Sequence, residues 1–375
     1  MKRDIHVLQI AFTYIGTIVG AGFATGQEIL QFFTQYGRVA TFTILIATIA
    51  FIWLGTRMML IAHDISAHSY EDLNKHLFGQ KAGKWISLFT LIIILGVNSV
   101  MLAGSGSVFV EHLNMHYQIG LLITLLGTYL LLGKGMRSIL QINSIVVPIM
   151  MILSLLLIFS TIKAPGADRF ITLGSDEPLL KGLLSPLLYT SFNLAMAQAV
   201  LVPLGAQTAS RSTIIKGGLI GGLGVGLMLM SAHFAMSAQM PGIQQFEIPM
   251  GNVAVQLGTA IQLLYITMIF MEIFSTFVAD IYGLTLQLQH HLLWHPRLIT
   301  LCIMSTCYLI SQFGFSSLLS VLYPIFGTLS LVWALTLIKN GYKGPPFQTI
   351  APEIQPSVIR TPEPDTKPPI KPTGT

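Results

Sequence analysis

The sequence contains few charged residues, and this scarcity argues against an ordinary water-soluble protein. Asp, Glu, Lys and Arg make up 9% of its 375 residues, whereas soluble domains carry roughly 25%. This is too little charge to cover a water-exposed surface. The net charge of +5 does not indicate nucleic-acid binding, because the basic residues are distributed as in a membrane protein, as described below. We therefore expect no nucleic-acid partner.

Cysteine is also scarce. Cys302 and Cys307 lie in one apolar segment, and a spacing of five residues places them on different faces of a helix. We interpret them as small buried hydrophobic residues, and expect neither a disulfide nor a metal site from this pair. The hydrolase motifs Gly-x-Ser-x-Gly and His-Glu-x-x-His are absent from the sequence. We expect no enzyme activity and no resident cofactor.

Long apolar segments, by contrast, are abundant. Hydrophobic residues make up 53% of the chain and occur in segments of about 20, the length that crosses a bilayer core. Nothing after Met1 resembles a removable signal peptide. The pattern predicts an all-α integral membrane protein with ten transmembrane helices. Their approximate limits are 7–36, 39–62, 84–110, 118–133, 138–162, 179–205, 212–240, 251–288, 297–312 and 316–339.

The distribution of Lys and Arg predicts the orientation. With the N-terminus inside, sixteen of these residues fall in cytoplasmic segments and four in external ones. Such a bias places both termini in the cytoplasm of a multi-pass protein of the cell membrane. The transmembrane domain is predicted to span 1–340. The Pro- and Thr-rich segment 341–375 is expected to be a disordered cytoplasmic tail.

Ten helices with both ends on one side can divide into two sets of five, the second inverted relative to the first. The first repeat would span about 7–162 and the second about 179–339. Helices 1 and 6 would then correspond, and both are predicted to be broken. The break in helix 1 is expected at 20–22, and that in helix 6 at 189–193.

The predicted break in helix 1 follows from its glycines. Four occur between Gly16 and Gly26, and each weakens a helix by about 1 kcal/mol relative to Ala. Unwound backbone persists inside a bilayer only where it lines a cavity or a buried site. There, free N–H groups suit a carboxylate and free carbonyls suit a cation. Gln27 and Glu28 follow, and intramembrane carboxyl groups usually mark a pathway or a paired site.

Close helix packing is the alternative explanation for these glycines, and it stays open. A second group of six glycines, between Gly217 and Gly226, has no polar neighbours. For that group we predict a packing face.

Helix 8 carries a second polar group. Glu272 and Asp280 are eight residues apart, on nearly the same helical face, with Ser275 and Thr276 between them. Hydroxyl, carbonyl and carboxylate oxygens of this kind can bind Na⁺ or relay a proton. Alternatively, the hydroxyls bond to their own helix, and Asp280 lies in water near the cytoplasmic end.

The segment Gly20-Ala21-Gly22-Phe23-Ala24-Thr25-Gly26-Gln27-Glu28, together with Phe274-Ser275-Thr276, resembles the YkvI-type membrane proteins. These are placed among amino acid permeases in the amino acid–polyamine–organocation superfamily. The resemblance covers about residues 5–340. It implies the LeuT-like fold, with five plus five inverted helices and broken helices 1 and 6.

The resemblance also implies a substrate site. Backbone N–H groups at the break would bind an amino acid's carboxylate, and helix 6 would surround the rest of the substrate. Two polar residues of helix 3 could face the same cavity, although packing explains them equally well. The candidate substrate-binding residues are Gly20, Ala21, Gly22, Phe23, Ser191, Phe192, Asn193, Asn98 and Ser105.

One coupling cation is implied between helices 1 and 8. Its ligands would be the carbonyls of Gly16, Val19 and Glu272 and the hydroxyls of Ser275 and Thr276. Some sodium-coupled members have a side-chain amide where this chain has Phe23, so a second sodium site is not expected. No other metal is expected. The candidates for proton transfer or gating are Gln27, Glu28 and Asp280.

The leading interpretation is a secondary active transporter of a small solute, an amino acid or a related amine, coupled to Na⁺ or H⁺ by alternating access. Its partners would be that solute and the lipid bilayer. The alternative is a membrane receptor or sensor that keeps a transporter-like site without moving solute. Substrate identity, transport direction and oligomeric state stay open.

Overall fold

The computed structural model describes residues 6–67, 69–132, 136–289 and 294–339, and within these ranges the regular structure is helical, without strands. The expected tail, 341–375, lies outside the described residues. Ten apolar helical segments follow one another along the chain, as predicted. Six are long and apolar enough to cross a membrane, and the others are shorter apolar helices.

The first two segments are composite. The first consists of α1 (Val7–Ile18), α2 (Ala21–Thr25) and α3 (Gln27–Phe32). The second consists of α4 (Arg38–Ala50), a π-helical turn, η2 (Phe51–Gly55), and α5 (Thr56–Ile65). The other eight are α7 (Gln80–Leu113), α8 (Tyr117–Leu132), α9 (Met136–Thr161), α11 (Leu179–Gln207), α12 (Arg211–Ser237), α14 (Thr259–Gln289), α15 (Pro296–Ser311) and α16 (Phe315–Lys339).

Short helices occupy the connections. They are η1 (Thr34–Tyr36), α6 (Tyr70–Phe78), α10 (Arg169–Thr172), η3 (Gly242–Gln245), α13 (Pro249–Val253) and η4 (Ala254–Leu257). Two of these change the prediction for helix 8, which begins at Thr259 instead of 251. Gly258, at φ 87°, separates η4 from α14, and only glycine adopts such a conformation without strain.

The predicted break in helix 6 is wrong. Helix α11 continues from Leu179 to Gln207. The stretch 189–193 contains neither glycine nor proline, so it has no residue that favours unwinding. Its polar side chains are compatible with a helix, since Asn193 Nδ2 donates to the carbonyl of Tyr189 at 3.0 Å. The division into inverted repeats at 7–162 and 179–339 stays a prediction.

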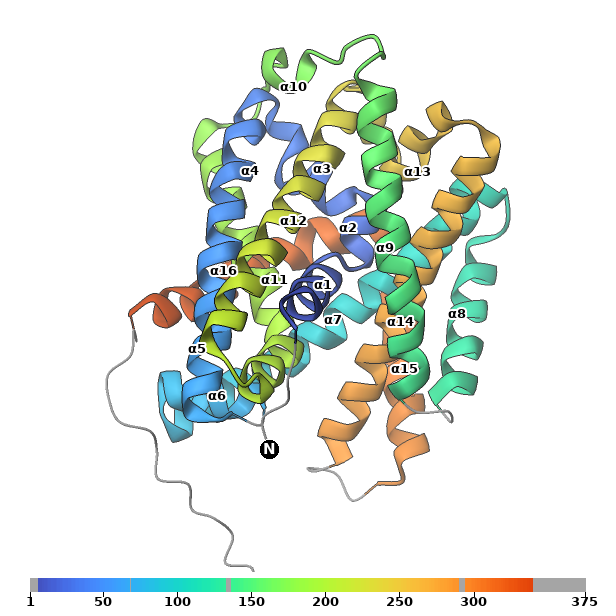
Figure 1. Cartoon of the computed structure of the whole chain (residues 1–375). Helices are drawn as coiled ribbons and strands as arrows, with labels where there is room; N and C mark the ends of the chain where they lie inside the picture. Colours follow the sequence, from blue (N-terminus) through green and yellow to red (C-terminus); the bar gives the residue numbers. More distant parts are fainter. Residues whose placement is uncertain (1–5, 68, 133–135, 290–293, 340–375) are drawn as a thin grey trace, which may run out of the picture. The chain divides into compact units, whose positions relative to one another are not determined.

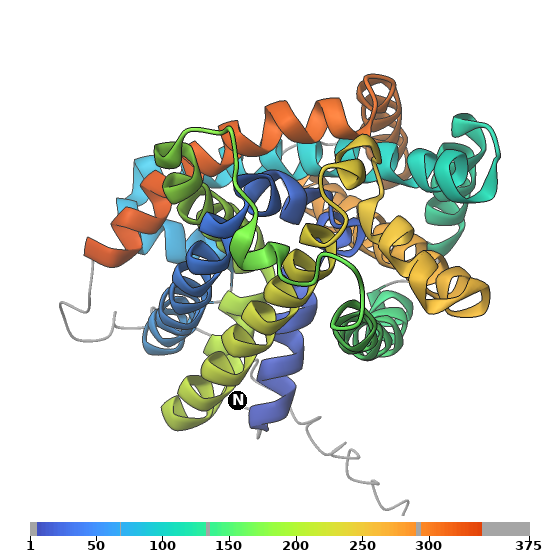
Figure 2. The ribbon, with the colours of Figure 1, turned by 90° about the horizontal axis from the view of Figure 1, so that it is seen from above.

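Helix α2 lies in the middle of the bundle (Figures 1 and 2), and α1 runs from there to the edge, beside α12 (Figure 2). Helix α1 packs mainly against α12 and also contacts α11, whereas α2 packs against α14 and α7. The interruption between α1 and α2 is therefore surrounded by other helices. This arrangement places the most irregular backbone of the first segment inside the protein, where neighbouring helices can compensate for lost backbone hydrogen bonds.

The glycines of α12 pack against other helices, as predicted, and they do so on two sides of the helix. A Cβ at Gly221 would lie 2.8 Å from Tyr14 of α1. A Cβ at Gly222 would lie 2.6 Å from Ile52 of η2, and one at Gly226 only 2.2 Å from Thr48 of α4. Small residues let the backbones approach closely, which is how helices associate in membranes.

Candidate functional site

The break in helix 1 is present, one residue earlier than predicted. Helix α1 ends at Ile18, Val19 has φ −79° and ψ 60°, and Gly20 has φ −76° and ψ −172°. Helix α2 then starts at Ala21, and its first return bond runs from the N–H of Ala24 to the carbonyl of Gly20, at 3.0 Å. The first three N–H groups of a helix have no partner in its own first turn. In α2 they belong to Ala21, Gly22 and Phe23.

A second break, which was not predicted, occurs at Gly26. This residue has φ 83°, a left-handed conformation, and separates α2 from α3. Its N–H donates to the carbonyl of Phe23, at 3.0 Å. The hydroxyl of Thr25 caps the same turn by donating to the carbonyl of Gly22, at 2.9 Å. The first transmembrane segment thus changes direction twice within eight residues.

Glu28 lies against the break. Although it is six residues after Gly22, a Cβ built on Gly22 would be 1.8 Å from Glu28 Oε1. Glu28 is only 5% exposed. The second glycine of the Gly-Ala-Gly motif therefore makes room for a carboxyl group of the same segment. The sequence signalled both residues but not their contact.

Two tyrosines lie beside this carboxyl group. The hydroxyls of Tyr189, on α11, and Tyr323, on α16, interact with Glu28. Both side chains are fully buried, and neither hydroxyl has a hydrogen-bond partner at good geometry. Sequence reasoning missed both residues, because a tyrosine in an apolar segment is more often a packing residue.

Of the predicted helix 6 residues, Phe192 approaches this region through an aromatic contact. Ser191, Phe192 and Asn193 are all buried. The ring of Phe192 lies 4.6 Å from that of Tyr323, and Tyr189 contacts Phe33 edge to face at 5.1 Å. An unbroken α11 therefore still supplies side chains around Glu28.

Among the described residues, three carboxyl groups of the transmembrane segments have no basic partner. Within the described residues, the ion pairs join Lys75 to Glu71, Lys181 to Glu177 and Arg211 to Asp64. None of them involves Glu28, Glu272 or Asp280. A carboxyl group removed from water needs a proton, a cation or hydrogen-bond donors. These three are therefore the strongest candidates for ion-dependent function.

Helix α14 carries the second predicted polar group. Glu272 is 1% exposed and its Oε2 has no partner. The hydroxyl of Ser275 donates to the carbonyl of Glu272, at 3.3 Å. This is a hydrogen bond within its own helix, the alternative to cation binding. The sodium ligand set also includes Thr276, Gly16 and Val19. It stays a prediction, because near the break α14 packs mainly against α2, whereas Gly16 lies on α1.

Asp280 is partly exposed and accepts a hydrogen bond from α7, so it is neither fully buried nor free in water. Asn98 Nδ2, on α7, donates to Asp280 Oδ2 at 3.3 Å and to the carbonyl of Ile94 at 2.8 Å. The pair connects α7 to α14. Ser105, the other candidate on α7, donates its hydroxyl to the carbonyl of Leu102, at 2.7 Å.

A polar network joins the loop before α13 to three helices. Both oxygens of Glu111 accept backbone N–H groups, from Glu247 at 2.6 Å and Ile248 at 2.9 Å. The carboxylate of Glu247 accepts the hydroxyl of Ser107 and the N–H of Ser316. Gln27 Nε2, on α3, donates to Ser316 Oγ at 3.2 Å. The candidate gating residue Gln27 is thus connected to this loop through α16.

His233 was not singled out in the sequence, yet it is fully buried on α12. Its Nδ1 lies 3.2 Å from the hydroxyls of Thr34 and Ser237, and its Nε2 lies 3.1 Å from that of Thr41. These contacts connect α12 to η1 and α4. We interpret His233 as a structural cross-link, because its ring nitrogens have partners.

Solved structures of membrane transporters share this arrangement of helices. MhsT in complex with L-phenylalanine matches with a TM-score of 0.65, at 14% identity, over 91% of each chain. A mutant of the manganese transporter of Eremococcus coleocola matches with 0.63, at 12% identity, over 88% of this chain and 78% of that one. The inward-facing conformation of Mhp1 matches with 0.54, at 13% identity, over 90% and 76%. The protein is an all-α membrane protein with the LeuT-like fold.

Sequence comparison gives the family. The chain is 39% identical over 337 residues to the membrane protein YkvI of Bacillus subtilis (strain 168), which covers 88% of this chain and 94% of that protein. It is 25% identical over 324 residues to YyaD of the same organism, covering 86% and 94%. No family model matches the chain. The chain belongs to the YkvI family of membrane proteins, as the resemblance in helices 1 and 8 implied.

Proposed function

We propose that this protein is a secondary active transporter of a small solute, an amino acid or a related amine, that works by alternating access. The observation that carries the proposal is the interrupted first segment, with its unwound residues Val19 and Gly20 inside the bundle and the buried Glu28 against Gly22. Broken helices at the centre of a membrane protein are typical of transporter binding sites. The LeuT-like fold agrees with this function.

The substrate's carboxylate would bind the N–H groups of Ala21, Gly22 and Phe23, which follow the unwound Gly20. Peptide N–H groups beside a break favour an anion. The side chains of Ser191, Phe192, Asn193, Asn98 and Ser105 would complete the site. An amino acid ligand in a protein of the same fold, the L-phenylalanine of MhsT, supports this choice of solute.

The coupling ion would be Na⁺ or H⁺. Sodium would bind the carbonyls of Gly16, Val19 and Glu272 and the hydroxyls of Ser275 and Thr276. A proton would be carried by Glu28, with Asp280 and Gln27 assisting in transfer or gating. The proton route is supported by the absence of a basic partner for Glu28 among the described residues and by the two tyrosine hydroxyls beside it.

Uptake into proteoliposomes under an imposed Na⁺ or H⁺ gradient tests the proposal. The double substitution Ser275→Ala and Thr276→Ala should abolish sodium stimulation, and Glu28→Gln should abolish proton stimulation. Loss of sodium stimulation in the first variant identifies Na⁺ as the coupling ion, and loss of proton stimulation in the second identifies H⁺. Thr306→Ala is a matched control, because the hydroxyl of Thr306 donates to its own helix, at 2.9 Å from Cys302 O, and is exposed. Equal uptake with and without either gradient would contradict coupled transport.

A receptor or sensor would behave differently in the same preparation. A ligand would raise the unfolding temperature, because a molecule that binds only the folded state stabilises it, yet no solute would enter the vesicles. That pattern would replace the transporter proposal by the sensor alternative.

The proposed location is the cell membrane, with both termini in the cytoplasm. It is supported by the sixteen basic residues in the segments assigned to the inside, against four in those assigned to the outside. Labelling of single cysteines in intact cells checks it. A cysteine replacing Lys75 should react only after the membrane is opened, and one replacing Lys181 should react from outside.

A further inference from the structure

A cavity of about 300 Å³ lies between α6, α7, α11 and α16, away from the break in helix 1. This volume is at the lower end of the range of pockets that bind small molecules. Nine of its twelve lining residues are apolar and none is charged. The lining includes the aromatic side chains of Phe78, Trp85, Phe89 and Trp333. A charged or strongly polar solute would therefore find little compensation for its lost hydration here.

The cavity reaches the surface of the protein. Trp85, which lines it five residues after the start of α7, is 72% exposed, and Val332 on α16 is also exposed. Tryptophan is enriched where a membrane meets water. A molecule dissolved in the bilayer could therefore enter between these two residues without crossing the aqueous phase.

Two polar side chains of the lining each have an atom without a hydrogen-bond partner among the described residues. Gln198, on α11, is 1% exposed and Ser330, on α16, is 3% exposed, and both line the cavity. Gln198 Nε2 donates to the carbonyl of Ala195 at 2.7 Å, but Gln198 Oε1 and Ser330 Oγ have no partner. Such groups are costly to leave unpaired. By contrast, the third polar lining residue, Thr90, donates to the carbonyl of Ile86 at 3.0 Å.

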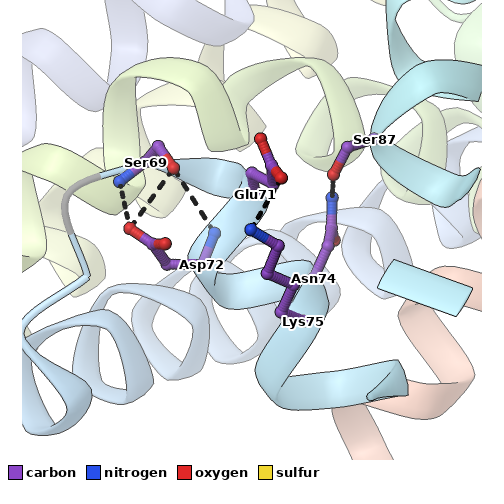
Figure 3. A network of polar contacts seen from close by, with 6 residues as sticks. All are labelled: Ser69, Glu71, Asp72, Asn74, Lys75 and Ser87. Carbon is purple, nitrogen blue, oxygen red and sulfur yellow. Dashed lines mark hydrogen bonds and ion pairs between the residues drawn. The ribbon is translucent and has the colours of Figure 1, made fainter. Parts of the chain in front are cut away.

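The wall formed by α6 is held in place by a polar network (Figure 3). Asn74 Nδ2 donates to Ser87 Oγ of α7 at 3.2 Å, and Trp333 Nε1 of α16 donates to Asn74 Oδ1 at 3.0 Å. Asn74 thus fixes both the short helix and one aromatic ring of the lining. A cavity with walls tied in this way is pre-formed, which lowers the entropic penalty of binding.

We propose that this cavity binds a small neutral molecule from the membrane, with an apolar body and a hydroxyl group. The body would lie against the aromatic wall, and the hydroxyl would donate to Gln198 Oε1 and accept from Ser330 Oγ. An anionic headgroup would not fit, because none of the described residues that line the cavity is Lys or Arg. The site is separate from the proposed solute site, and its occupancy does not depend on transport.

Fluorescence quenching by a brominated alcohol tests this proposal. The full-length protein with Trp53, Trp85 and Trp294 replaced by Phe retains only Trp333, which is buried beside the cavity. In lipid nanodiscs, 4-bromobenzyl alcohol should quench Trp333 saturably. Its methyl ether cannot donate a hydrogen bond. The ether should therefore reach half-saturation at a concentration about tenfold higher, as expected for the loss of one or two hydrogen bonds.

Substitutions in the cavity provide the matched controls. Gln198→Met with Ser330→Ala should make the alcohol bind as weakly as the ether, whereas Thr90→Val should leave the difference between them intact. Thermal unfolding verifies that each variant is folded. Two results would overturn the proposal and leave the cavity to lipid or water. One is quenching that rises linearly with the concentration of the probe in the membrane, and the other is equal half-saturation for alcohol and ether in the Trp333-only protein.

Discussion

The contact between Gly22 and Glu28 gives the sharpest prediction. A Cβ at position 22 would lie 1.8 Å from Oε1, 2.4 Å from Cδ and 2.7 Å from Cγ of Glu28. Non-bonded carbon atoms prefer about 3.5–4.0 Å, so Gly22→Ala must displace the Glu28 carboxyl group by more than an ångström. The carboxyl group is buried and lies beside Tyr189 and Tyr323.

Gly20→Ala is the matched control. It changes the same motif in the same way, but a Cβ there meets no heavy atom within 4 Å, and φ is −76°. Overpacking a buried site costs about 1–3 kcal/mol. We therefore expect Gly22→Ala to lower the free energy of unfolding by that amount and to reduce uptake by at least tenfold. Gly20→Ala should stay close to the parent protein in both measurements.

Thermal unfolding in detergent and initial uptake rates in proteoliposomes provide the two readouts. A third variant, Gly22→Ala combined with Glu28→Ala, removes the colliding side chain. It should regain stability, because contacting residues are not additive, but should not regain transport. If Gly22→Ala transports at the parent rate, or if both glycine variants lose activity equally, the contact between Gly22 and Glu28 is not needed for transport.

Three further predictions concern stability and the loop before α13. Gly26→Ala should destabilise the protein in thermal unfolding by about 2–5 kcal/mol, the sum of a left-handed backbone and overpacking by a Cβ 2.4 Å from Met250; an unchanged unfolding temperature would contradict this. His233→Leu should cost about 1–3 kcal/mol by leaving buried hydroxyls unpaired, whereas Ser231→Ala, which loses a bond to its own helix, should change the unfolding temperature little; equal losses would contradict the cross-link. Glu111→Gln removes one of the two carboxylate oxygens that accept the N–H groups of residues 247 and 248, and should increase protease cleavage near residue 247; unchanged cleavage would refute the role of Glu111 in fixing this loop.

Much of the fold could be predicted because a bilayer allows few solutions. Apolar segments of membrane-spanning length gave the ten helical segments in order, since only a helix satisfies its own backbone in lipid. The glycines of α12 were assigned to packing for the same kind of reason, as they had no polar neighbours. Helix α6 was missed, because it is short and polar. It is stabilised by its Ser69–Asp72 capping box and by contacts with α7.

The candidate site could be predicted only in part. Glycines indicated the break in helix 1, because they weaken a helix wherever they occur. No such signal existed at 189–193, where correspondence between repeats suggested a break and the local residues favoured a helix. Contacts between segments far apart in the chain could not be predicted from the sequence. Glu28 meets Tyr189 and Tyr323 only because α3, α11 and α16 converge, and Asp280 meets Asn98 only because α14 packs on α7.

We propose that a small solute crosses the membrane through a site at the break in helix 1. The most direct measurement is uptake of a panel of radiolabelled amino acids and amines into proteoliposomes, with Gly22→Ala and Gly20→Ala proteins side by side. We expect saturable uptake of at least one solute by the parent and Gly20→Ala proteins, and strongly reduced uptake by Gly22→Ala. Ligand-induced stabilisation without uptake by any of the three proteins would contradict the proposal.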